Sequence, residues 1–309
     1  MREVRIPAFA KINLRLDILG QRPDGYHELR TIFQSVSLHD DLLLHATRWP
    51  GISLSIQGNE SLSREPVEKN LVYRAIEAMH SELGGRAGVR GVEIELRKKI
   101  PAGRGLGGGS SDAAAALLGY LRLTKCTVSP ATLFAIAASL GADVPFFLFG
   151  GRALGVGRGD EVYPLPDIPK LVALIVSPRD IHVPTPDAYR WINARQRRPI
   201  PLTKHVIHPK LWKFCALCWS AQGGGLSNDF ERPVFRRYAR LAAIKRDLLH
   251  RGASEASLAG SGSAVFGVFP SPALARRAAV GFPHDQTFVC ETLSRDRYLR
   301  AVTGARVVR

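Results

Sequence analysis

Hydrophobic and polar residues alternate almost without a break from Val4 to Leu19. The apolar members of this pattern are Ile12, Leu14, Leu16 and Ile18, and the polar members are Lys11, Asn13, Arg15 and Asp17. Because successive side chains of a β-strand point to opposite faces, this period of two predicts a strand with one buried and one polar face.

Similar patterns predict further elements along the chain. Alternation and short apolar runs are typical of strands, whereas apolar residues three and four positions apart are typical of helices. In the first half, we expect strands at 42–46, 52–56 and 92–96, and helices at 70–83 and 130–141, the second capped by Ser129. In the second half, we expect a strand at 171–176, a helix capped by Thr185, basic helices at 209–221 and 230–250, a glycine-serine turn and strand at 257–269, a helix at 272–280 and a strand at 287–293. This order predicts an α+β arrangement.

A glycine-rich stretch, 101–118, joins the strand at 92–96 to an alanine-rich helix. Clustered glycines suit a backbone that adopts positive φ or approaches a ligand closely. We expect Ser110, Ser111 and Asp112 to cap the helix, where free N–H groups attract an anion. The stretch predicts a phosphate-binding loop; the alternative is a flexible loop ahead of a helix. Because it contains no Gly-Lys-Ser/Thr, it is not a Walker-type loop, and a catalytic cation must come from elsewhere.

Three other places carry candidate chemistry. Lys11 follows small and apolar residues, so it is either a partly desolvated cation beside a phosphate or an ordinary strand lysine. Asp143 lies between a helix end and an apolar run, where it is either a cap or a functional carboxylate. Tyr26 and His27 follow a Pro-Asp-Gly turn, and at the tip of this loop they suit a flat heteroaromatic ligand, although packed turn aromatics show the same pattern.

The glycine-rich segment 155–169 has the composition of a domain boundary. We therefore expect a first domain at 1–160 and a second at 161–309. A chain of 309 residues is long enough for two domains.

The net charge of +16 is the one unusual bulk property. It keeps a nucleic-acid-binding protein open as a remote alternative. The basic residues are spread along the chain, however, and the clusters at 195–198, 236–237 and 276–277 have no interleaved aromatics.

Of the four cysteines, Cys215 and Cys218 form a lone CxxC on an expected helix, which does not indicate zinc or a disulfide framework. No apolar run is long enough to span a bilayer, so we expect a cytoplasmic protein without a membrane partner.

Several sequence blocks resemble one enzyme family. PAGRGLGGGSSDAAAAL is similar to the phosphate-binding motif of the GHMP small-molecule kinases. Within that superfamily, AKINLRLDILGQRPDGYHEL resembles the N-terminal signature of the kinases that phosphorylate 4-diphosphocytidyl-2-C-methyl-D-erythritol in the non-mevalonate route to isoprenoids. Further similar blocks, in the order and spacing of that family, are GADVPFF, VPTPDAY, NDFE and LAGSGSAVF. The resemblance covers essentially the whole chain. It implies a two-domain α+β fold, with an N-terminal ribosomal-protein-like domain, a C-terminal ferredoxin-like domain and the active site in the cleft between them.

The resemblance also implies roles for individual residues. It assigns catalysis to Lys11 and Asp143, and it places Tyr26 and Tyr189 on either side of a cytosine ring. The full set near the cytidine substrate is Asn13, Tyr26, His27, Thr185 and Tyr189. The set assigned to ATP is Pro101, Ala102, Gly103, Arg104, Gly105, Leu106, Gly107, Gly108, Gly109, Ser110 and Ser111. ATP and Mg²⁺ are implied, with the metal ligands unidentified, and the protein could be a monomer or a homodimer.

Three positions depart from the family pattern. Tyr189 stands where phenylalanine is more common, Arg104 where the loop usually has a small residue, and Ala259 where serine is common. A GHMP kinase acting on homoserine or mevalonate is the alternative, but Tyr26, His27 and Tyr189 favour a cytidine substrate.

Overall fold

The computed structural model describes residues 2–193 and 225–304. Its first sheet has seven strands and is built around the long antiparallel pair β1 (Glu3–Gln21) and β2 (His27–Thr47). The path of the sheet runs β3-β4-β2-β1-β8, with β5 on β2 and β6 on β5. The other strands are β3 (Gly51–Gln57), β4 (Gly91–Arg97), β5 (Arg152–Gly157), β6 (Glu161–Pro164) and β8 (Ser227–Asn228).

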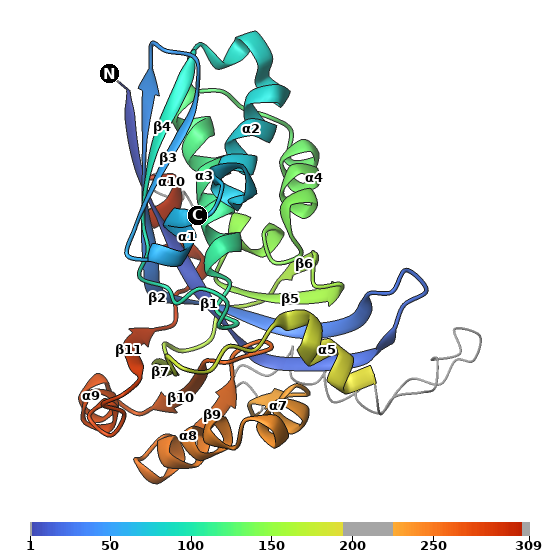
Figure 1. The fold of residues 1–309 in the computed structure, drawn as a ribbon, viewed down its shortest axis with the longest axis vertical. Helices are drawn as coiled ribbons and strands as arrows, with labels where there is room; N and C mark the ends of the chain where they lie inside the picture. Colours follow the sequence, from blue (N-terminus) through green and yellow to red (C-terminus); the bar gives the residue numbers. More distant parts are fainter. Residues whose placement is uncertain (1, 194–224, 305–309) are drawn as a thin grey trace.

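Three helices cover one face of this sheet, to the right of it in Figure 1: α2 (Leu71–Leu83), α3 (Gly108–Thr124) and α4 (Pro130–Leu140). Helix α2 buries one stripe of side chains, which includes Val72, Ile76 and Met79, against α3. Short elements complete this part of the chain: α1 (Glu60–Arg64), η1 (Val67–Lys69), η2 (Gly84–Ala87) and η3 (Pro145–Leu148). We call this sheet with its helices the first lobe.

The second lobe contains a four-stranded antiparallel sheet in the order β11-β7-β10-β9. Its strands are β7 (Val172–Ser177), β9 (Glu255–Leu258), β10 (Val265–Phe269) and β11 (Gln286–Glu291). Its helices are α5 (Thr185–Asn193), α7 (Glu231–Arg237), α8 (Ala239–His250) and α9 (Pro272–Ala279). The last helix, α10 (Arg295–Thr303), returns to the first lobe, where Tyr298 and Val302 join the hydrophobic core.

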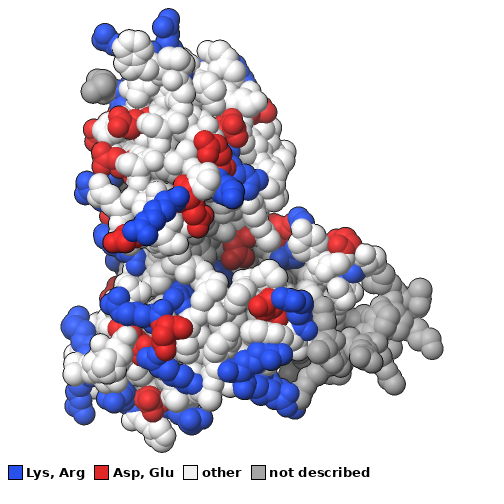
Figure 2. All heavy atoms as spheres, in the orientation of Figure 1, with Lys and Arg blue, Asp and Glu red and all other residues white. Residues whose placement is uncertain are grey.

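The two lobes share strand β1. Its first part buries Ile6 and Ala8 in the core of the first lobe, while Leu16 and Ile18 are buried in the core of the second. A third apolar cluster takes residues from both lobes, among them Ile12 of β1 and Phe266 of β10. The lobes are therefore held together by continuous packing, and the hollow visible between them in Figure 2 has a rigid base. On the face shown there, Lys and Arg side chains lie on both lobes.

Most expected elements are confirmed. The alternation at 4–19 is β1, but its polar face is also buried, because Lys11, Asn13 and Asp17 are enclosed between the lobes. Helices α2 and α4 begin after Asn70 and Ser129, whose side chains accept hydrogen bonds from the first turn. The strand expected at 42–46 is the end of a much longer strand, and the helix expected at 230–250 divides into α7 and α8 at Tyr238. The expected helix at 209–221, the basic cluster at 195–198 and the Cys215–Cys218 pair lie outside the described residues.

The domain division near residue 160 stays a proposal. Residue 160 lies in the tight turn between β5 and β6, and Val156 pairs with Glu161 across it. A division that leaves this hairpin intact falls between β6 and β7, at 165–171.

A buried ionic cluster fixes the segment that leads into the glycine-rich stretch. Lys98 Nζ lies 2.5 Å from Asp40 Oδ2 and 2.6 Å from Asp112 Oδ2. The second oxygen of Asp40 accepts from the backbone N–H groups of Lys99 and Ile100. Burial, with the neighbouring Asp40 carboxylate, raises the pKa of the Asp112 carboxyl to about 8 although Lys98 opposes the shift. Burial acts to lower the pKa of Lys98, but the two carboxylates outweigh it and raise that pKa.

The cluster predicts a pH dependence of stability that Asp112→Asn removes. Because the folded-state pKa of Asp112 lies above that of the unfolded chain, the folded protein binds more protons between about pH 4 and pH 8, and its stability falls as the pH rises through this window. Asparagine imitates the protonated carboxyl. We expect the free energy of unfolding of the variant, relative to that of the wild type, to rise by on the order of 1 kcal/mol for each pH unit in this window. Urea unfolding at several pH values measures this difference. The exposed Asp247→Asn serves as control; a pH-independent difference between Asp112→Asn and the wild type would contradict the assignment.

Candidate active site

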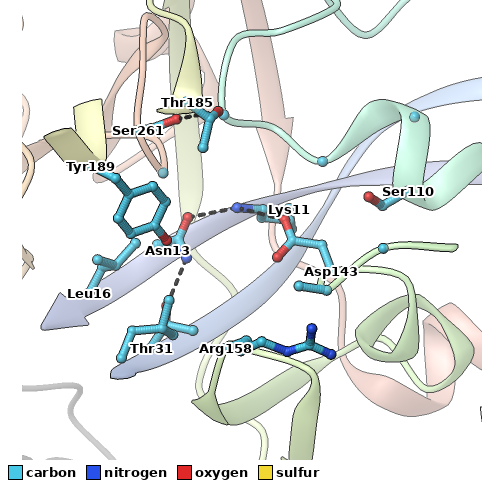
Figure 3. Close-up of a pocket in the computed structure, with 18 of the residues that line it drawn as sticks. Lys11, Asn13, Leu16, Thr31, Ser110, Asp143, Arg158, Thr185, Tyr189 and Ser261 are labelled. Carbon is cyan, nitrogen blue, oxygen red and sulfur yellow. Dashed lines mark hydrogen bonds and ion pairs between the residues drawn. The ribbon is translucent and has the colours of Figure 1, made fainter. Parts of the chain in front are cut away.

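A cavity of about 970 Å³ lies between the lobes. It is lined by β1, the start of β2, the glycine-rich stretch, the residues after α4, the β5–β6 turn and the start of α5. Figure 3 shows Lys11, Asn13, Asp143 and Tyr189 pointing into it from these separate elements. Segments far apart in the sequence therefore meet at one site.

The glycine-rich stretch begins with a tight loop, 101–107, which we call the glycine loop. Gly103, Gly105 and Gly107 have φ of 66°, 80° and 71°, a region that side chains rarely allow. The backbone N–H of Lys11 donates to the carbonyl of Leu106 at 3.0 Å, so the loop is attached to β1. The backbone of the loop is thus held beside the Lys11 side chain.

The expected cap of the helix after this loop was wrong. Helix α3 begins at Gly108, with Gly107 as its N-cap and no side-chain cap, because the left-handed glycine already turns the chain into the helix. Ser110, Ser111 and Asp112 lie inside its first turns. Ser110 lines the cavity, whereas Ser111 points into the first lobe and is 1% exposed.

Lys11 is the buried cation of the site. It is 4% exposed, and its Nζ donates to Asn13 Oδ1 at 2.9 Å. Asn13 is held in turn by Thr31, whose hydroxyl accepts from Asn13 Nδ2 at 2.7 Å and donates to the carbonyl of Arg15. This chain of hydrogen bonds fixes the direction of the ammonium group.

Asp143 lies opposite Lys11. It follows α4, just before η3, and its Oδ2 is 3.4 Å from Lys11 Nζ. The Asp143 side chain is one-third exposed, at 33%, toward the cavity, whereas the Lys11 side chain is only 5% exposed. The carboxylate is thus open to a ligand on one side and compensated by a buried cation on the other.

Aromatic rings form the wall of the cavity farthest from the glycine loop along β1. Tyr189 of α5 stacks on His27, with ring centroids 4.6 Å apart, and meets the edge of Phe230 at 4.9 Å. Burial raises the pKa of the Tyr189 hydroxyl. The expected loop-tip position of His27 was wrong, because His27 begins β2 and is 8% exposed. Tyr26 is at the tip and 56% exposed, and the Arg158 guanidinium lies 4.9 Å from its ring centre.

Thr185 does not cap helix α5 as expected. The helix begins at Thr185 itself, and its hydroxyl lies 3.0 Å from that of Ser261. Ser261 belongs to the turn 259–264 between β9 and β10, which we call the second-lobe turn. This contact closes one edge of the cavity (Figure 3).

All but two of the residues expected at the site line the cavity. The exceptions are the exposed Ala102 and Ser111, which lies on the buried face of α3. Several lining residues were not anticipated: Leu16, Thr31, Arg158, Phe230, Gly260 and Ser261. Arg158 lies in the segment interpreted as a domain boundary, whose Gly-Arg-Gly motif was the available signal for a tight turn carrying a cation.

The sequence matches two family models, the GHMP kinases N-terminal domain at residues 70–151 and the GHMP kinases C-terminal model at residues 211–284. It is 44% identical over 300 residues to 4-diphosphocytidyl-2-C-methyl-D-erythritol kinase of Solibacter usitatus (strain Ellin6076), covering 96% of this chain and 91% of the relative. The chain belongs to the 4-diphosphocytidyl-2-C-methyl-D-erythritol kinase family. It is therefore a small-molecule kinase of the GHMP superfamily.

Other members of the family agree. The kinase of the same name from Moorella thermoacetica (strain ATCC 39073 / JCM 9320) is 40% identical over 295 residues, covering 93% of this chain and 98% of the relative. A crystal structure of 4-(cytidine 5'-diphospho)-2C-methyl-D-erythritol kinase superposes with a TM-score of 0.75 at 35% identity, covering 94% of this chain and 99% of that one. These matches confirm the two-domain α+β fold of the kinase family.

More distant kinases share the fold. Homoserine kinase from Cytophaga hutchinsonii superposes with a TM-score of 0.66 at 22% identity, covering 95% of each chain.

Among the described residues, no helix is long and apolar enough to cross a membrane, and no cluster of three or more His, Cys, Asp or Glu side chains could hold a metal ion.

Proposed function

We propose that the protein transfers the γ-phosphoryl group of ATP to the 2-hydroxyl of 4-diphosphocytidyl-2-C-methyl-D-erythritol, a step of the non-mevalonate route to isoprenoid precursors. The observation that carries the proposal is the Lys11–Asp143 pair, 3.4 Å apart, in a cavity bounded by the glycine loop on one side and an aromatic wall on the other. The names of the relatives support the same alcohol.

Asp143 acts as the general base. Its carboxylate accepts the proton of the substrate hydroxyl as the hydroxyl oxygen bonds to the γ-phosphorus and the bond from that phosphorus to the ADP oxygen breaks. Asp143 suits this role because its free side faces the cavity, where an alcohol can approach.

Lys11 orients Asp143 and stabilises the transferred group. Its ammonium is fixed by Asn13 and nearly excluded from water, so its charge is poorly screened. Phosphoryl transfer depends on positioning and on compensation of charge on the phosphoryl oxygens. Lys11 takes the place of the lysine that a Walker-type loop would supply and that the glycine loop lacks.

The glycine loop and the N-terminus of α3 bind the phosphates of ATP. Backbone N–H groups at a helix N-terminus, with the positive end of its dipole, bind anions without a lysine in the loop. The residues assigned to this role are those of 101–110 that line the cavity.

The aromatic wall binds the cytidine end of the substrate. Tyr189, His27 and Tyr26 offer ring faces to a base, and Asn13 and Thr185 offer polar groups. One face of Tyr189 is covered by His27, so a base seated on that face must displace the His27 ring. The placement of cytosine between Tyr26 and Tyr189 stays a prediction.

The lining residues fit a magnesium ion that is held mainly by the nucleotide. Mg²⁺ in kinases usually takes one or two protein oxygens and completes its shell with phosphates and water. The Ser110 hydroxyl lies at the start of α3 and lines the cavity, so it would be the protein oxygen that holds the ion, while the Asp143 carboxylate stays available as the base. When bound, the ion would neutralise phosphate charge.

A cytoplasmic location and a monomeric or homodimeric state also stay predictions.

The substrate is tested by incubating the protein with ATP and each of three alcohols. We expect ³¹P NMR to show a new phosphate ester on the 2-hydroxyl of the cytidine substrate, and no phosphorylation of homoserine or mevalonate. Transfer to homoserine or mevalonate alone would contradict the proposed alcohol and leave the assignment to the GHMP superfamily intact. Salt-sensitive oligonucleotide binding without any ATP turnover would favour the nucleic-acid alternative instead.

A further inference from the structure

The glycine loop of this chain contains an arginine whose backbone is fixed against the second lobe. Arg104 lies between Gly103 and Gly105, and its carbonyl accepts from the N–H of Ala264 at 3.2 Å. A Cβ on Gly105 would lie 1.9 Å from the carbonyl oxygen of Ala259, so the loop touches the second-lobe turn directly. The position of Arg104 is therefore determined by both lobes.

The Arg104 side chain is held by neutral acceptors. Its Nη1 donates to Ser263 Oγ at 2.8 Å, and its Nη2 donates to the carbonyl of Arg179 at 3.3 Å. Ser263 is fully buried and donates its own hydrogen to the carbonyl of Ile181 at 2.6 Å, which leaves its oxygen to accept from Arg104. Two hydrogen bonds fix the plane of the guanidinium and leave some of its five N–H groups for another partner.

No carboxylate of the described residues forms an ion pair with Arg104. Asp180 is the acidic neighbour that influences it, but Asp180 pairs with Arg240. The guanidinium is half-buried, and this burial lowers its pKa, as expected for a charge that has lost water without gaining an anion. Charges in such positions are normally paired, so the environment favours the arrival of a negative group.

Arg104 lines the same cavity as the glycine residues that follow it. We propose that the Arg104 guanidinium binds the polyphosphate of the nucleotide from the second-lobe side, opposite the N-terminus of α3. This rests on the proposed function, since it assumes that the glycine loop binds ATP. Arginine suits phosphate because its planar fork donates two parallel hydrogen bonds to one phosphate group. Arg104 thereby adds a side-chain cation to a loop that otherwise offers backbone N–H groups.

The test is calorimetric titration of the full chain with ATP, and separately with AMP, in the presence of Mg²⁺ and without the alcohol. Arg104→Gln should weaken ATP binding about tenfold to a hundredfold, because charge-assisted hydrogen bonds to a charged partner are lost. AMP, which lacks the outer phosphates, should lose less than about threefold. Arg104→Lys, which keeps the charge but not the fork, should lie between the wild type and Arg104→Gln.

Two control variants distinguish the loss of the Arg104 charge from a change in the structure around it. Arg179→Gln removes an exposed arginine side chain of the same charge and should leave both affinities unchanged. Ser263→Ala removes one of the two neutral groups that accept hydrogen bonds from the guanidinium, and it should weaken ATP binding less than Arg104→Gln does.

Wild-type ATP affinity in Arg104→Gln would overturn the proposal. An equal loss of ATP and AMP affinity with a lowered melting temperature would also overturn it, and would indicate that Arg104 only joins the lobes. If the wild-type protein itself bound no ATP, the proposed function would fail, which is a different result from either.

Discussion

Replacing Asp143 by asparagine is expected to lower turnover by a factor on the order of 10² or more while ATP affinity stays nearly unchanged. Asparagine keeps the shape of the side chain, which is 33% exposed to the cavity, but it accepts no proton from the alcohol. The substitution also leaves the Lys11 ammonium in place, so the phosphates still meet a cation. The measurement is kcat from coupled ADP release, together with the Kd of ATP by calorimetry.

The matched control is Asp247→Asn, an exposed aspartate on α8 that is not among the residues lining the cavity. It should retain wild-type kcat. Near wild-type turnover in Asp143→Asn would show that Asp143 is a structural carboxylate at the end of α4 and not the base.

Lys11→Met is expected to lower turnover to a similar extent, again on the order of 10² or more. Methionine fills most of the same volume but removes the charge that offsets Asp143 at 3.4 Å and the hydrogen bond to Asn13 at 2.9 Å. The transferred phosphoryl group then meets no buried cation from β1. The readouts are kcat and the melting temperature, measured on the same preparations.

Lys170→Met is the control, because Lys170 is an exposed lysine paired with Glu291. It should keep both turnover and melting temperature close to the wild type. If Lys11→Met kept its turnover and lost only thermal stability, Lys11 would be an ordinary strand lysine.

The sequence predicts this site well where local patterns decide the structure. Alternation places Lys11 and Asn13 on the same face of β1, and the glycines of 103–107 indicate a backbone with positive φ, which all three adopt. That Lys11 meets Asp143, which is more than a hundred residues away, follows only from the resemblance to the kinase family, since no periodicity relates the two residues.

Other features depend on tertiary contacts that no local pattern contains. Ser110 and Ser111 are good capping residues, yet Gly107 ends the loop and the helix starts before them. His27 follows a turn motif, yet it pairs with Gln21 in the last rung of a long hairpin before its turn and stacks on Tyr189 of the other lobe. Helix α10 was not anticipated, and it packs on the first lobe although it follows the last strand of the second.

Arg104 shows the same limit. In sequence it is a departure within a glycine-rich motif, with no indication of where its side chain points. The structure directs it to Ser263 and to the carbonyl of Arg179, residues of the other lobe. Only the folded structure shows that both groups accepting from Arg104 are neutral, so that its charge beside the cavity has no paired carboxylate among the described residues.

The central claim is that one cavity joins a nucleotide and a cytidine-bearing alcohol around Lys11 and Asp143. The most direct measurement is the rate of ADP release by the wild-type protein from MgATP, with and without 4-diphosphocytidyl-2-C-methyl-D-erythritol. We expect release to depend on the alcohol and to form one ADP per phosphorylated product. ADP release that is absent, or that proceeds at the same rate without the alcohol, would contradict the claim.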